Sequence, residues 1–492
     1  MDLCIVNPPE MAGYVSDRDK AGGIGVARPY KKRWRTSYVP PTPAMDLLYA
    51  LALAEEEGIA CHFVDAIAHR WNQTRTIREI VNTKPSHVGV RVSLPSLEED
   101  LALANAIVQK LPSARVFLFG QAIKTTHSTW LENFRGDAAF YGEVEALLLP
   151  YLRGLNGLAV LRPGEALGGC LEWQSVDNLD ELPFPAWHRV DTAAYSPTGR
   201  QADFVYYILT SRGCPKGCAM CPYYIHQGKV WRARSIDNIV GEFEHLRLLG
   251  ARLVQTRDPN ISWRKQHLLA LAERLQGQTH FSITTETDLE ALSRGDLEKL
   301  KAAGFTRIMT GVESVDEAVL REIHQNGQAL KRSLENMTTC AELGIRVTGF
   351  FIVGALTENW RSVRSTVETA RRLPCEYSVS LMTPYPGTET RDAFIAAGFH
   401  RETRFHFYNG YTGMVRTHGL DYAEVNLAHA WASAELELVT RERLWRDARG
   451  VERVLAQGRL WVQQGRLLPL RNRVRQAALK NEAHQAPERH SA

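Results

Sequence analysis

The sequence predicts an α/β protein in which two separate strand–helix alternations are followed by a helical end. Residues 1–150 alternate short apolar runs with helical patterns, residues 201–395 do so again, and residues 396–492 lose the strand pattern. The first alternation predicts an N-terminal doubly wound, Rossmann-like domain, and the second predicts a partial (β/α)6 barrel. A chain of 492 residues is also too long for a single core, so several domains are expected.

The N-terminal domain is expected from five apolar runs separated by helical patterns. These runs are Leu3–Asn7, His62–Asp65, His87–Ser93, Arg115–Phe119 and Ala138–Tyr141. In a doubly wound sheet of this kind, ligands bind at the carboxyl ends of the strands. Residues 151–200 are richer in Pro, Gly and polar side chains, so a linker between domains is expected there.

The barrel at residues 201–395 is expected from six further runs with intervening helices. The runs are Phe204–Leu209, Arg252–Thr256, His280–Thr284, Arg307–Thr310, Arg346–Ile352 and Tyr377–Leu381. In such a barrel the catalytic groups sit at the carboxyl ends of the strands. Beyond it, the patterns at Asp421–Arg449 and Val451–Gln464 predict amphipathic helices in a helical C-terminal domain, residues 396–492.

Composition narrows the class of protein. The apolar fraction is 44% and the charged fraction 23%, which is typical of a globular chain. A net charge of +4 is too small to indicate a nucleic-acid partner. No run approaches the roughly 18 apolar residues of a membrane span. The N-terminal MDLCIVNPPE has no positive segment followed by a long apolar one, so we expect a cytoplasmic protein.

Three of the eight cysteines form a cluster. Cys214, Cys218 and Cys221 have the spacing C-x3-C-x2-C, within TSRGCPKGCAMCPYY, directly after a predicted strand. In a reducing compartment such a cluster indicates metal, since thiolates suit iron–sulfur clusters and zinc. A zinc site would need a fourth ligand, for which His226 is the local candidate. The remaining cysteines are expected to be buried thiols: Cys4, Cys61, Cys170, Cys340 and Cys375.

This motif, at the end of the first barrel strand, resembles that of the radical S-adenosylmethionine (SAM) superfamily. The resemblance implies a [4Fe–4S] cluster on Cys214, Cys218 and Cys221, with one iron left open to chelate SAM. It also implies reductive cleavage of SAM to a 5′-deoxyadenosyl radical. The position before the third cysteine is usually aromatic in this family and is Met220 here, which weakens a packing contact with adenine. Tyr223 follows in the C-P-Y ending common in the cobalamin-linked branch.

Later segments fall where this family places its other SAM contacts. Thr310-Gly311-Val312-Glu313-Ser314 resembles the family's G-x-E-S segment, which implies that Gly311, Glu313 and Ser314 contact SAM. Glu286 closes the preceding strand and is expected to add a carboxylate. Ile352 lies in a strand resembling the one that approaches adenine. Taken singly, a polar residue at a strand end is more often a helix cap.

The N-terminal domain resembles the cobalamin-binding domain of the same enzymes. The segments EEEGIACHFVDAIA, KPSHVGVRVSLPS, VFLFGQA and FYGEVEALL follow in the family's order and spacing, and the resemblance covers nearly all of residues 1–380. It implies bound cobalamin. The alternative is a nucleotide-type fold that binds nothing. Cofactor contacts are expected from eight residues: Asp65, Arg91, Ser93, Leu94, Gly120, Gln121, Gly142 and Glu143.

Two departures from related cobalamin domains bear on how the cofactor is held. The D-x-H-x-x-G motif, whose histidine binds cobalt in some mutases, is absent, because Asp65 is followed by Ala66-Ile67-Ala68-His69. Cobalamin is therefore expected to bind without a protein histidine on cobalt, and Arg91, Ser93 and Leu94 are candidates to line its lower face. The family's double glycine after the fourth strand is here Gly120-Gln121.

The resemblance implies a cobalamin-dependent radical SAM methyltransferase. Such an enzyme methylates an unactivated carbon of a small-molecule substrate, through methylcobalamin and the 5′-deoxyadenosyl radical, and needs a one-electron donor such as flavodoxin or ferredoxin. One alternative is a ring-forming, oxygen-inserting or rearranging enzyme with the same cofactors, as in the anaerobic magnesium-protoporphyrin cyclase-like members of the family. Another is a cofactor-binding regulator without turnover. The substrate is not predicted by the sequence.

Overall fold

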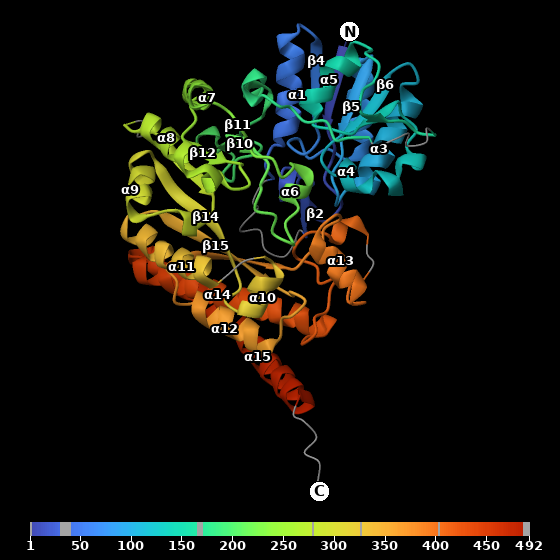
Figure 1. The fold of residues 1–492 in the computed structure, drawn as a ribbon. Helices are drawn as coiled ribbons and strands as arrows, with labels where there is room; N and C mark the ends of the chain where they lie inside the picture. Colours follow the sequence, from blue (N-terminus) through green and yellow to red (C-terminus); the bar gives the residue numbers. More distant parts are fainter. Residues whose placement is uncertain are drawn as a thin grey trace.

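The computed structural model describes residues 2–29, 41–164, 171–277, 280–324, 327–401 and 404–485. Cys170, expected to be a buried thiol, lies outside these ranges. Two six-stranded sheets dominate the fold, one in the N-terminal third and one in the middle of the chain. Figure 1 shows the first sheet in blue, the second in green to orange, and a pair of red helices at the C-terminal end.

The N-terminal sheet has the order β4-β1-β5-β6-β7-β8. Its first five strands are parallel, and β8 is an antiparallel edge strand. This is the doubly wound topology predicted from the apolar runs, with the strand order reversing beside β1. The strands are β1 (Asp2–Asn7), β4 (Ala60–Asp65), β5 (His87–Arg91), β6 (Arg115–Phe119), β7 (Ala138–Phe140) and β8 (Val160–Leu161).

Helices cover both faces of this sheet because alternate strand residues point to opposite sides. Ile5 and Phe117 pack with the helices α1 and α5, whereas Val6 and Val88 pack with α2 and α3. A short helix, α4, follows β6. The bounds are α1 (Met45–Glu56), α2 (Gln73–Thr83), α3 (Leu97–Lys110), α4 (Ile123–Thr126) and α5 (Val144–Leu152).

The second sheet is an all-parallel, partial barrel with the order β16-β15-β14-β13-β12-β9. Consecutive strands are neighbours, as a (β/α)6 barrel requires, and all six had been predicted from the sequence. Inward-facing positions alternate with buried ones along β12 and β13. The strands are β9 (Val205–Ile208), β12 (Leu253–Thr256), β13 (Ser282–Glu286), β14 (Phe305–Glu313), β15 (Arg346–Val353) and β16 (Glu376–Leu381).

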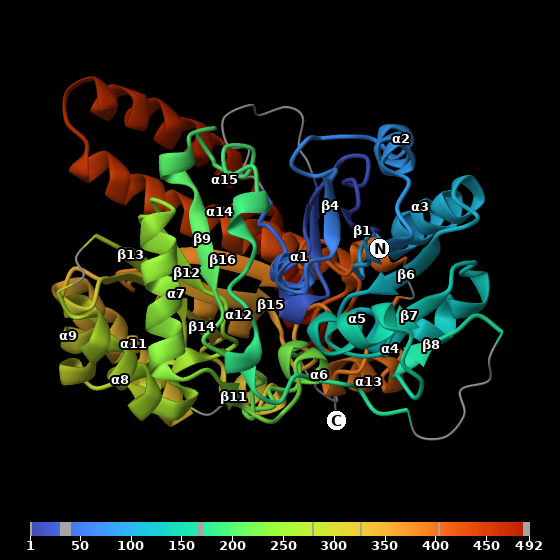
Figure 2. The same ribbon diagram turned by 90° about the horizontal axis from the view of Figure 1, so that it is seen from above.

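The helices that connect these strands cover the outer surface of the barrel, as Figure 2 shows for α7, α8, α9 and α11. Their apolar sides join the main hydrophobic core through residues such as Phe243, Leu271 and Leu297. The bounds are α7 (Ile236–Leu248), α8 (Lys265–Leu275), α9 (Arg294–Ala302), α10 (Glu317–Glu322), α11 (Gly327–Glu342), α12 (Trp360–Ala370) and α13 (Glu389–Ala396).

Two long helices, α14 (Tyr422–Asp447) and α15 (Gly450–Gln485), form the C-terminal hairpin. Helix α15 continues well past Gln464, where the sequence pattern had placed its end. The continuation has a physical reason, since Leu467, Val474 and Ala478 extend the buried stripe at helical spacing against α14. None of the described helices is both long and apolar enough to cross a bilayer.

Several short elements lie where the two sheets approach each other. An antiparallel hairpin, β2 (Tyr14–Asp17) and β3 (Val26–Pro29), follows β1, and the glycine-rich turn between its strands contacts α6 (Tyr223–His226). A two-residue ribbon pairs β10 (Ser211–Arg212) with β11 (Arg232–Ala233). Figure 1 shows α6 between the two sheets. The loops at the carboxyl ends of both sheets therefore face one junction.

Candidate functional site

The cysteine cluster lies in a loop that the β10–β11 ribbon closes at its base. Cys214, Cys218 and Cys221 are all free thiols and all half-buried. The loop is held by the backbone, because the Cys214 N–H donates to the Gly228 carbonyl at 3.0 Å and the Cys221 N–H to the Cys218 carbonyl at 3.0 Å. The carboxyl end of β9 thus presents three thiols in one pre-arranged loop.

The thiols do not converge on a single point. Within the described parts of the chain, no three His, Cys, Asp or Glu side chains are grouped closely enough to hold one metal ion. A zinc ion would need four converging ligands, whereas each thiolate of an iron–sulfur cluster binds a different iron. Burial raises the pKa of the Cys218 thiol to about 11, so without a bound metal the thiols stay protonated. Three thiols in one loop are the number of cysteine ligands that a [4Fe–4S] cluster with one open iron would use.

Two carboxylates stand beside this loop, of which Glu313 is buried and Glu286 half-buried. Glu286 ends β13 and Glu313 ends the neighbouring strand β14. Burial and, to a smaller extent, the nearby charge of Glu286 raise the pKa of Glu313 to about 8. Burial also raises the pKa of Glu286 to about 7, with a smaller contribution from Asp288. The two predicted acidic residues therefore lie close together. The positive charge around them is too small to keep their pKa values in the ordinary range.

Glu313 is also conformationally unusual. Its φ is +60°, a left-handed value that is costly for a residue with a side chain. Its carboxylate folds back over Gly311, where a Cβ atom would lie 2.3 Å from Glu313 Oε1. The buried Oε2 has no hydrogen-bond partner among the described residues. A strained, buried acceptor without a partner is expected where a bound cation or N–H donor completes the site.

Charged residues that the motifs did not indicate surround the acid pair. Lys216, inside the cysteine loop, pairs with Asp288 at 2.8 Å. Arg257, at the end of β12, bonds Asp19 at 2.9 Å and so ties the barrel to the loop after β2. Lys216 was visible in the sequence between two cysteines, but its partner is 72 positions further along the chain, and no local pattern reveals such a pairing.

The apolar residues that were predicted to contact SAM lie on one side of the cysteine loop. Met220 and Ile352 pack in a hydrophobic cluster that also contains Leu94 from the N-terminal domain. Tyr223 begins α6, and its Cα lies 3.0 Å from the position that a Cβ on Gly22 would take. This apolar cluster spans both sheets and borders the cysteine loop, as packing on an adenine would require.

Ser314 lies differently from its neighbour Glu313. It is fully buried, and its hydroxyl lies 3.1 Å from the Thr366 hydroxyl and accepts the Asp316 N–H at 3.2 Å. The hydroxyl thus helps to start α10. A contact from Ser314 to SAM therefore stays a prediction.

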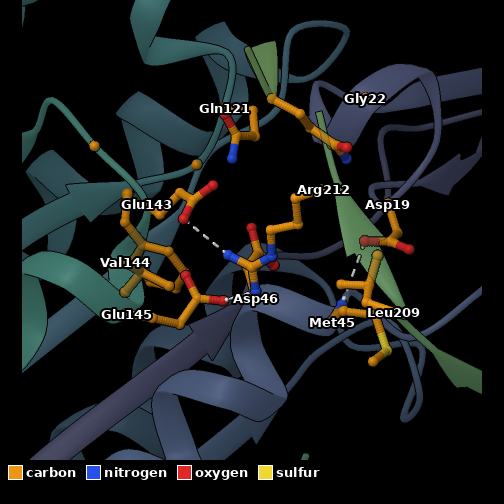
Figure 3. Close-up of a pocket in the computed structure, with 15 residues that line it drawn as sticks. Asp19, Gly22, Met45, Asp46, Gln121, Glu143, Val144, Glu145, Leu209 and Arg212 are labelled. Atoms are coloured by element: carbon orange, nitrogen blue, oxygen red, sulfur yellow. Dashed lines mark hydrogen bonds and ion pairs between the residues drawn. The ribbon is translucent and has the colours of Figure 1, made fainter. Parts of the chain in front are cut away.

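A cavity lies between the N-terminal sheet and the barrel. It is lined by loops of the first domain and by Leu209, Arg212 and Gln227 of the barrel region. Figure 3 shows Arg212 between Glu143 and Glu145, which accept its hydrogen bonds and ion pairs. The N-terminal residues of the lining are Asp19, Gly22, Gly23, Met45, Asp46, Phe119, Gly120, Gln121, Gly142, Glu143, Val144 and Glu145.

Four of the eight predicted cobalamin contacts meet in this cavity: Gly120, Gln121, Gly142 and Glu143. Gly120 has a φ of +132°, and a Cβ there would lie 2.5 Å from the Val92 carbonyl, so only glycine fits. Glu143 opens α5 and accepts from Arg212 and Arg232 at 3.0 and 2.7 Å. These contacts hold the second half of the chain against the cavity wall.

The other predicted contacts lie away from the lining. Asp65 is buried and accepts from Tyr195 at 2.7 Å and Asn7 at 2.9 Å. All five N–H donors of the Arg91 guanidinium have protein acceptors, and Ser93 Oγ accepts from both Arg91 and Arg18. The acceptors for Arg91 are on Asp46, Val92, Ser93, Arg18 and Gly23. Arg91 therefore orders the loops beside the cavity, and its contact with cobalamin stays a prediction.

Two amides and a histidine connect the cysteine loop to the cavity. Gln121 Oε1 and Gln227 Oε1 are buried acceptors that line the cavity and have no partner among the described residues. His226, next to Gln227, lies 3.0 Å through Nδ1 from the Gln121 carbonyl, and burial lowers its pKa to about 3. A neutral histidine thus joins α6 to the loop after β6. None of the lining residues is a histidine.

Comparison with protein families defines the class. The model of the radical SAM superfamily matches residues 208–370. The match begins at the end of β9, contains the cysteine loop and both carboxylates, and ends within α12. This part of the barrel is therefore similar to a radical SAM domain.

Comparison with individual proteins shows which proteins resemble the whole chain, beyond the barrel. The chain is 23% identical to an uncharacterized methyltransferase of Pyrococcus horikoshii, over 72% of this chain and 79% of that protein. Other curated relatives match over 35% to 62% of their own lengths. Two solved structures share the fold. TsrM of Kitasatospora setae, solved with cobalamin and a [4Fe–4S] cluster, has a TM-score of 0.60 and 15% identity, covering 97% of this chain and 99% of that one.

The second structure is the cobalamin-dependent SAM radical enzyme OxsB with aqua-cobalamin bound. It has a TM-score of 0.71 and 13% identity, and the alignment covers 95% of this chain and 72% of OxsB. The likeness extends over both sheets and the C-terminal helices. The chain thus combines a region similar to a radical SAM domain with the overall fold of cobalamin-dependent radical SAM enzymes.

Proposed function

We propose that this protein is a cobalamin-dependent radical SAM methyltransferase that methylates an unactivated carbon of a small-molecule substrate. One observation carries the proposal: the acid pair lies beside the cysteine loop, and α6, which follows that loop, is bonded to the cavity wall through His226 and Gln121. The names of its relatives support the outcome, since the Pyrococcus horikoshii protein and TsrM are described as methyltransferases. A one-electron donor such as flavodoxin or ferredoxin would complete the system.

The cofactors would divide the chemistry between them. A [4Fe–4S] cluster on Cys214, Cys218 and Cys221 would supply the electron for reductive cleavage of SAM, and cobalamin would supply the methyl group. The chain itself would bind and orient these groups and exclude water from them.

The acid pair would hold the cationic end of SAM. The amino group of SAM carries N–H donors and a positive charge, which is what the unpartnered Glu313 Oε2 and the neighbouring Glu286 lack. A cation between the two carboxylates would favour their ionised forms and hold both at fixed positions. Met220 and Ile352 would offer apolar surface to the adenine.

The lining of the cavity between the sheets would suit the amide-bearing edge of cobalamin by its acceptor chemistry. The corrin ring carries primary amides, which are N–H donors, and the cavity lining is rich in acceptors. Gln121 Oε1 and Gln227 Oε1 are the two that lack a partner. With no histidine in the lining, the cobalt would have no protein histidine ligand from this surface.

Product analysis tests the proposal. The anaerobically purified protein would be supplied with hydroxocobalamin, SAM and a strong reductant, and the small molecules analysed by mass spectrometry. Formation of both 5′-deoxyadenosine and S-adenosylhomocysteine is expected, because SAM would serve as both radical source and methyl donor. Formation of 5′-deoxyadenosine without S-adenosylhomocysteine would contradict methyl transfer and favour a ring-forming or rearranging enzyme.

A further inference from the structure

The C-terminal helix α15 has two apolar faces, of which only one is covered. Leu460, Leu467 and Val474 are at most 6% exposed and pack in the main core. The opposite side carries large apolar side chains that are 51% to 72% exposed. These are Val454, Leu455, Trp461, Val462 and Leu468. We call these five residues the outer face.

The outer face consists of two apolar rows along the helix. Val454, Trp461 and Leu468 are spaced by seven residues and so lie above one another, and Leu455 and Val462 form a second row about 100° further round the helix, with Gly458 and Gly465 between the rows. These five are among only twelve large apolar side chains that are exposed anywhere in the described chain. All five lie within 15 consecutive positions. Exposed apolar residues that are scattered singly over a surface are ordinary, whereas a concentration of them indicates a binding surface.

Positive charge flanks this patch along its whole length. Residues 453–478 contain six arginines and no acidic residue. Arg471 pairs with the buried Glu435 of α14 at 2.6 Å, and Arg453 lies over the Trp445 ring. The other four, all exposed, are Arg459, Arg466, Arg473 and Arg475. The surface therefore combines a tryptophan and branched apolar side chains with a cationic border.

We propose that the outer face of α15 docks on the surface of a bilayer that contains anionic phospholipid. A helix with arginines beside an exposed apolar face that includes tryptophan lies in the plane of the headgroups, with its apolar side chains among the upper acyl carbons. Anionic headgroups complement the arginines. A second copy of α15 would not, because it would bring another set of arginines against the first.

The position of the hairpin permits such an approach. Figure 1 shows the end of α15 projecting beyond the two sheets, and Figure 2 shows the α14–α15 hairpin at the margin of the molecule. The hairpin therefore lies at the edge of the molecule and not between its two sheets. The barrel edge lies close by, since α14 packs on β16. Docking would place the barrel near the membrane surface while the chain stays on one side of it.

Sedimentation with vesicles tests this inference, which does not depend on the proposed reaction or on any cofactor. The full chain is expected to bind vesicles of phosphatidylcholine with phosphatidylglycerol much more strongly than vesicles of phosphatidylcholine alone. Binding should weaken as salt rises, because salt screens the arginine–headgroup attraction. Equal binding to both vesicle types, or none to either, would overturn the proposal.

Two variants separate the apolar and the ionic contributions. Val454→Ser/Trp461→Ser/Leu468→Ser should weaken vesicle binding roughly tenfold or more by removing apolar side chains that would enter the bilayer. Arg459→Glu/Arg473→Glu should weaken binding to anionic vesicles about tenfold or more, since each arginine contributes about 1 kcal/mol at such a surface. Unchanged binding by both variants would overturn the proposal.

A matched control and a solution measurement complete the test. Leu155→Ser/Leu248→Ser replaces apolar side chains that are 56% and 76% exposed elsewhere and should bind vesicles like the parent chain. Light scattering after gel filtration should give the same mass for the parent chain and the triple serine variant. A dimeric parent with a monomeric triple variant would mean that the outer face joins two copies, and would overturn membrane docking.

Discussion

At the scale of single residues, the three thiols of the cysteine loop are distinguished from the others by position, not by exposure. Cys214, Cys218 and Cys221 share one loop at a strand end, whereas Cys61 is equally half-buried but stands alone on β4. We expect anaerobic reconstitution to give about four irons per chain in the parent protein. Cys218→Ser should lose most of that iron in a colorimetric assay, and Cys61→Ser should keep it. Equal iron in both variants would contradict the assignment.

The acid pair makes a prediction about affinity for SAM. Glu313→Gln removes a carboxyl group that has no partner in the protein and that would ionise against the cationic SAM, so SAM should bind about ten- to a hundredfold more weakly to the variant by calorimetry. Glu376→Gln is the matched control, because Glu376 is also a glutamate on a barrel strand but is paired with Arg307 and lies at the opposite end of the strands. The assignment is wrong if the two variants bind SAM equally well.

Glu358 makes a prediction about pH. Its buried carboxyl accepts the Gly354 N–H where β15 ends, and burial raises its pKa to about 8 from an ordinary value of 4.5. The folded protein thus holds this proton while the unfolded chain releases it. Stability from this group is present below pH 4.5 and is lost as the pH rises to about 8, by up to about 1.4 kcal/mol per pH unit.

Glu358→Gln keeps an acceptor for the Gly354 N–H but has no proton to lose. The variant should therefore gain stability relative to the parent as the pH rises from 5 towards 8. Thermal unfolding of both proteins across this range measures the difference. A constant difference at every pH would show that Glu358 titrates normally in the folded protein.

At the scale of elements, the first turn of α5 is tied to the β10–β11 ribbon by a buried ionic network. Arg212 bonds Glu143 at 3.0 Å and Glu145 at 2.7 Å, and Arg232 adds a bond to Glu143 at 2.7 Å. Breaking a buried network leaves uncompensated charge. Arg212→Met should therefore lower the free energy of unfolding by about 3–5 kcal/mol in urea titrations.

A second substitution separates charge from packing in this network. Arg212→Met/Glu145→Gln removes one of the stranded carboxylates and should recover part of the lost stability. If the double variant is no more stable than Arg212→Met, packing of the arginine stem is the larger contribution. The network matters for function because both of its glutamates line the cavity.

The elements were largely predictable because their signals are local. Every strand of the barrel and the five parallel strands of the first sheet came from apolar runs of ordinary strand length. The β2–β3 hairpin was not predicted, because its strands are short and lie in glycine-rich sequence. The end of α15 was placed too early, since Gly465 and Pro469 weaken the helical pattern that Leu467 and Val474 continue.

Only those residues of the site that belong to sequence motifs could be predicted. The cysteines, Glu286, Glu313 and Gly120 lie at strand ends, where parallel sheets gather ligand-binding groups. Pairings across the chain, such as Arg257 with Asp19, have no local signal. The direction of a side chain within a motif could not be predicted either. Glu313 faces the cysteine loop, whereas the hydroxyl of its neighbour Ser314 is hydrogen-bonded to Thr366.

At the scale of the whole molecule, both sheets direct the carboxyl ends of their strands to one junction. At the cavity, the N-terminal sheet contributes the loops after β6 and β7, and the barrel region contributes Leu209 after β9, Arg212 of β10 and Gln227 after α6. His226 links the two halves through its contact with Gln121. A cofactor bound in the cavity would therefore be held by both halves of the chain and stand near the cluster.

The measurement that tests this arrangement most directly is cobalamin retention. The reconstituted protein would be incubated anaerobically with hydroxocobalamin, passed through gel filtration, and assayed for iron and corrinoid in the protein fraction. The account predicts a single tightly held corrinoid per chain, with clear loss of corrinoid in a Gln121→Ala/Gln227→Ala variant that keeps its iron. A parent protein that carries its full complement of iron but retains no corrinoid would contradict the account.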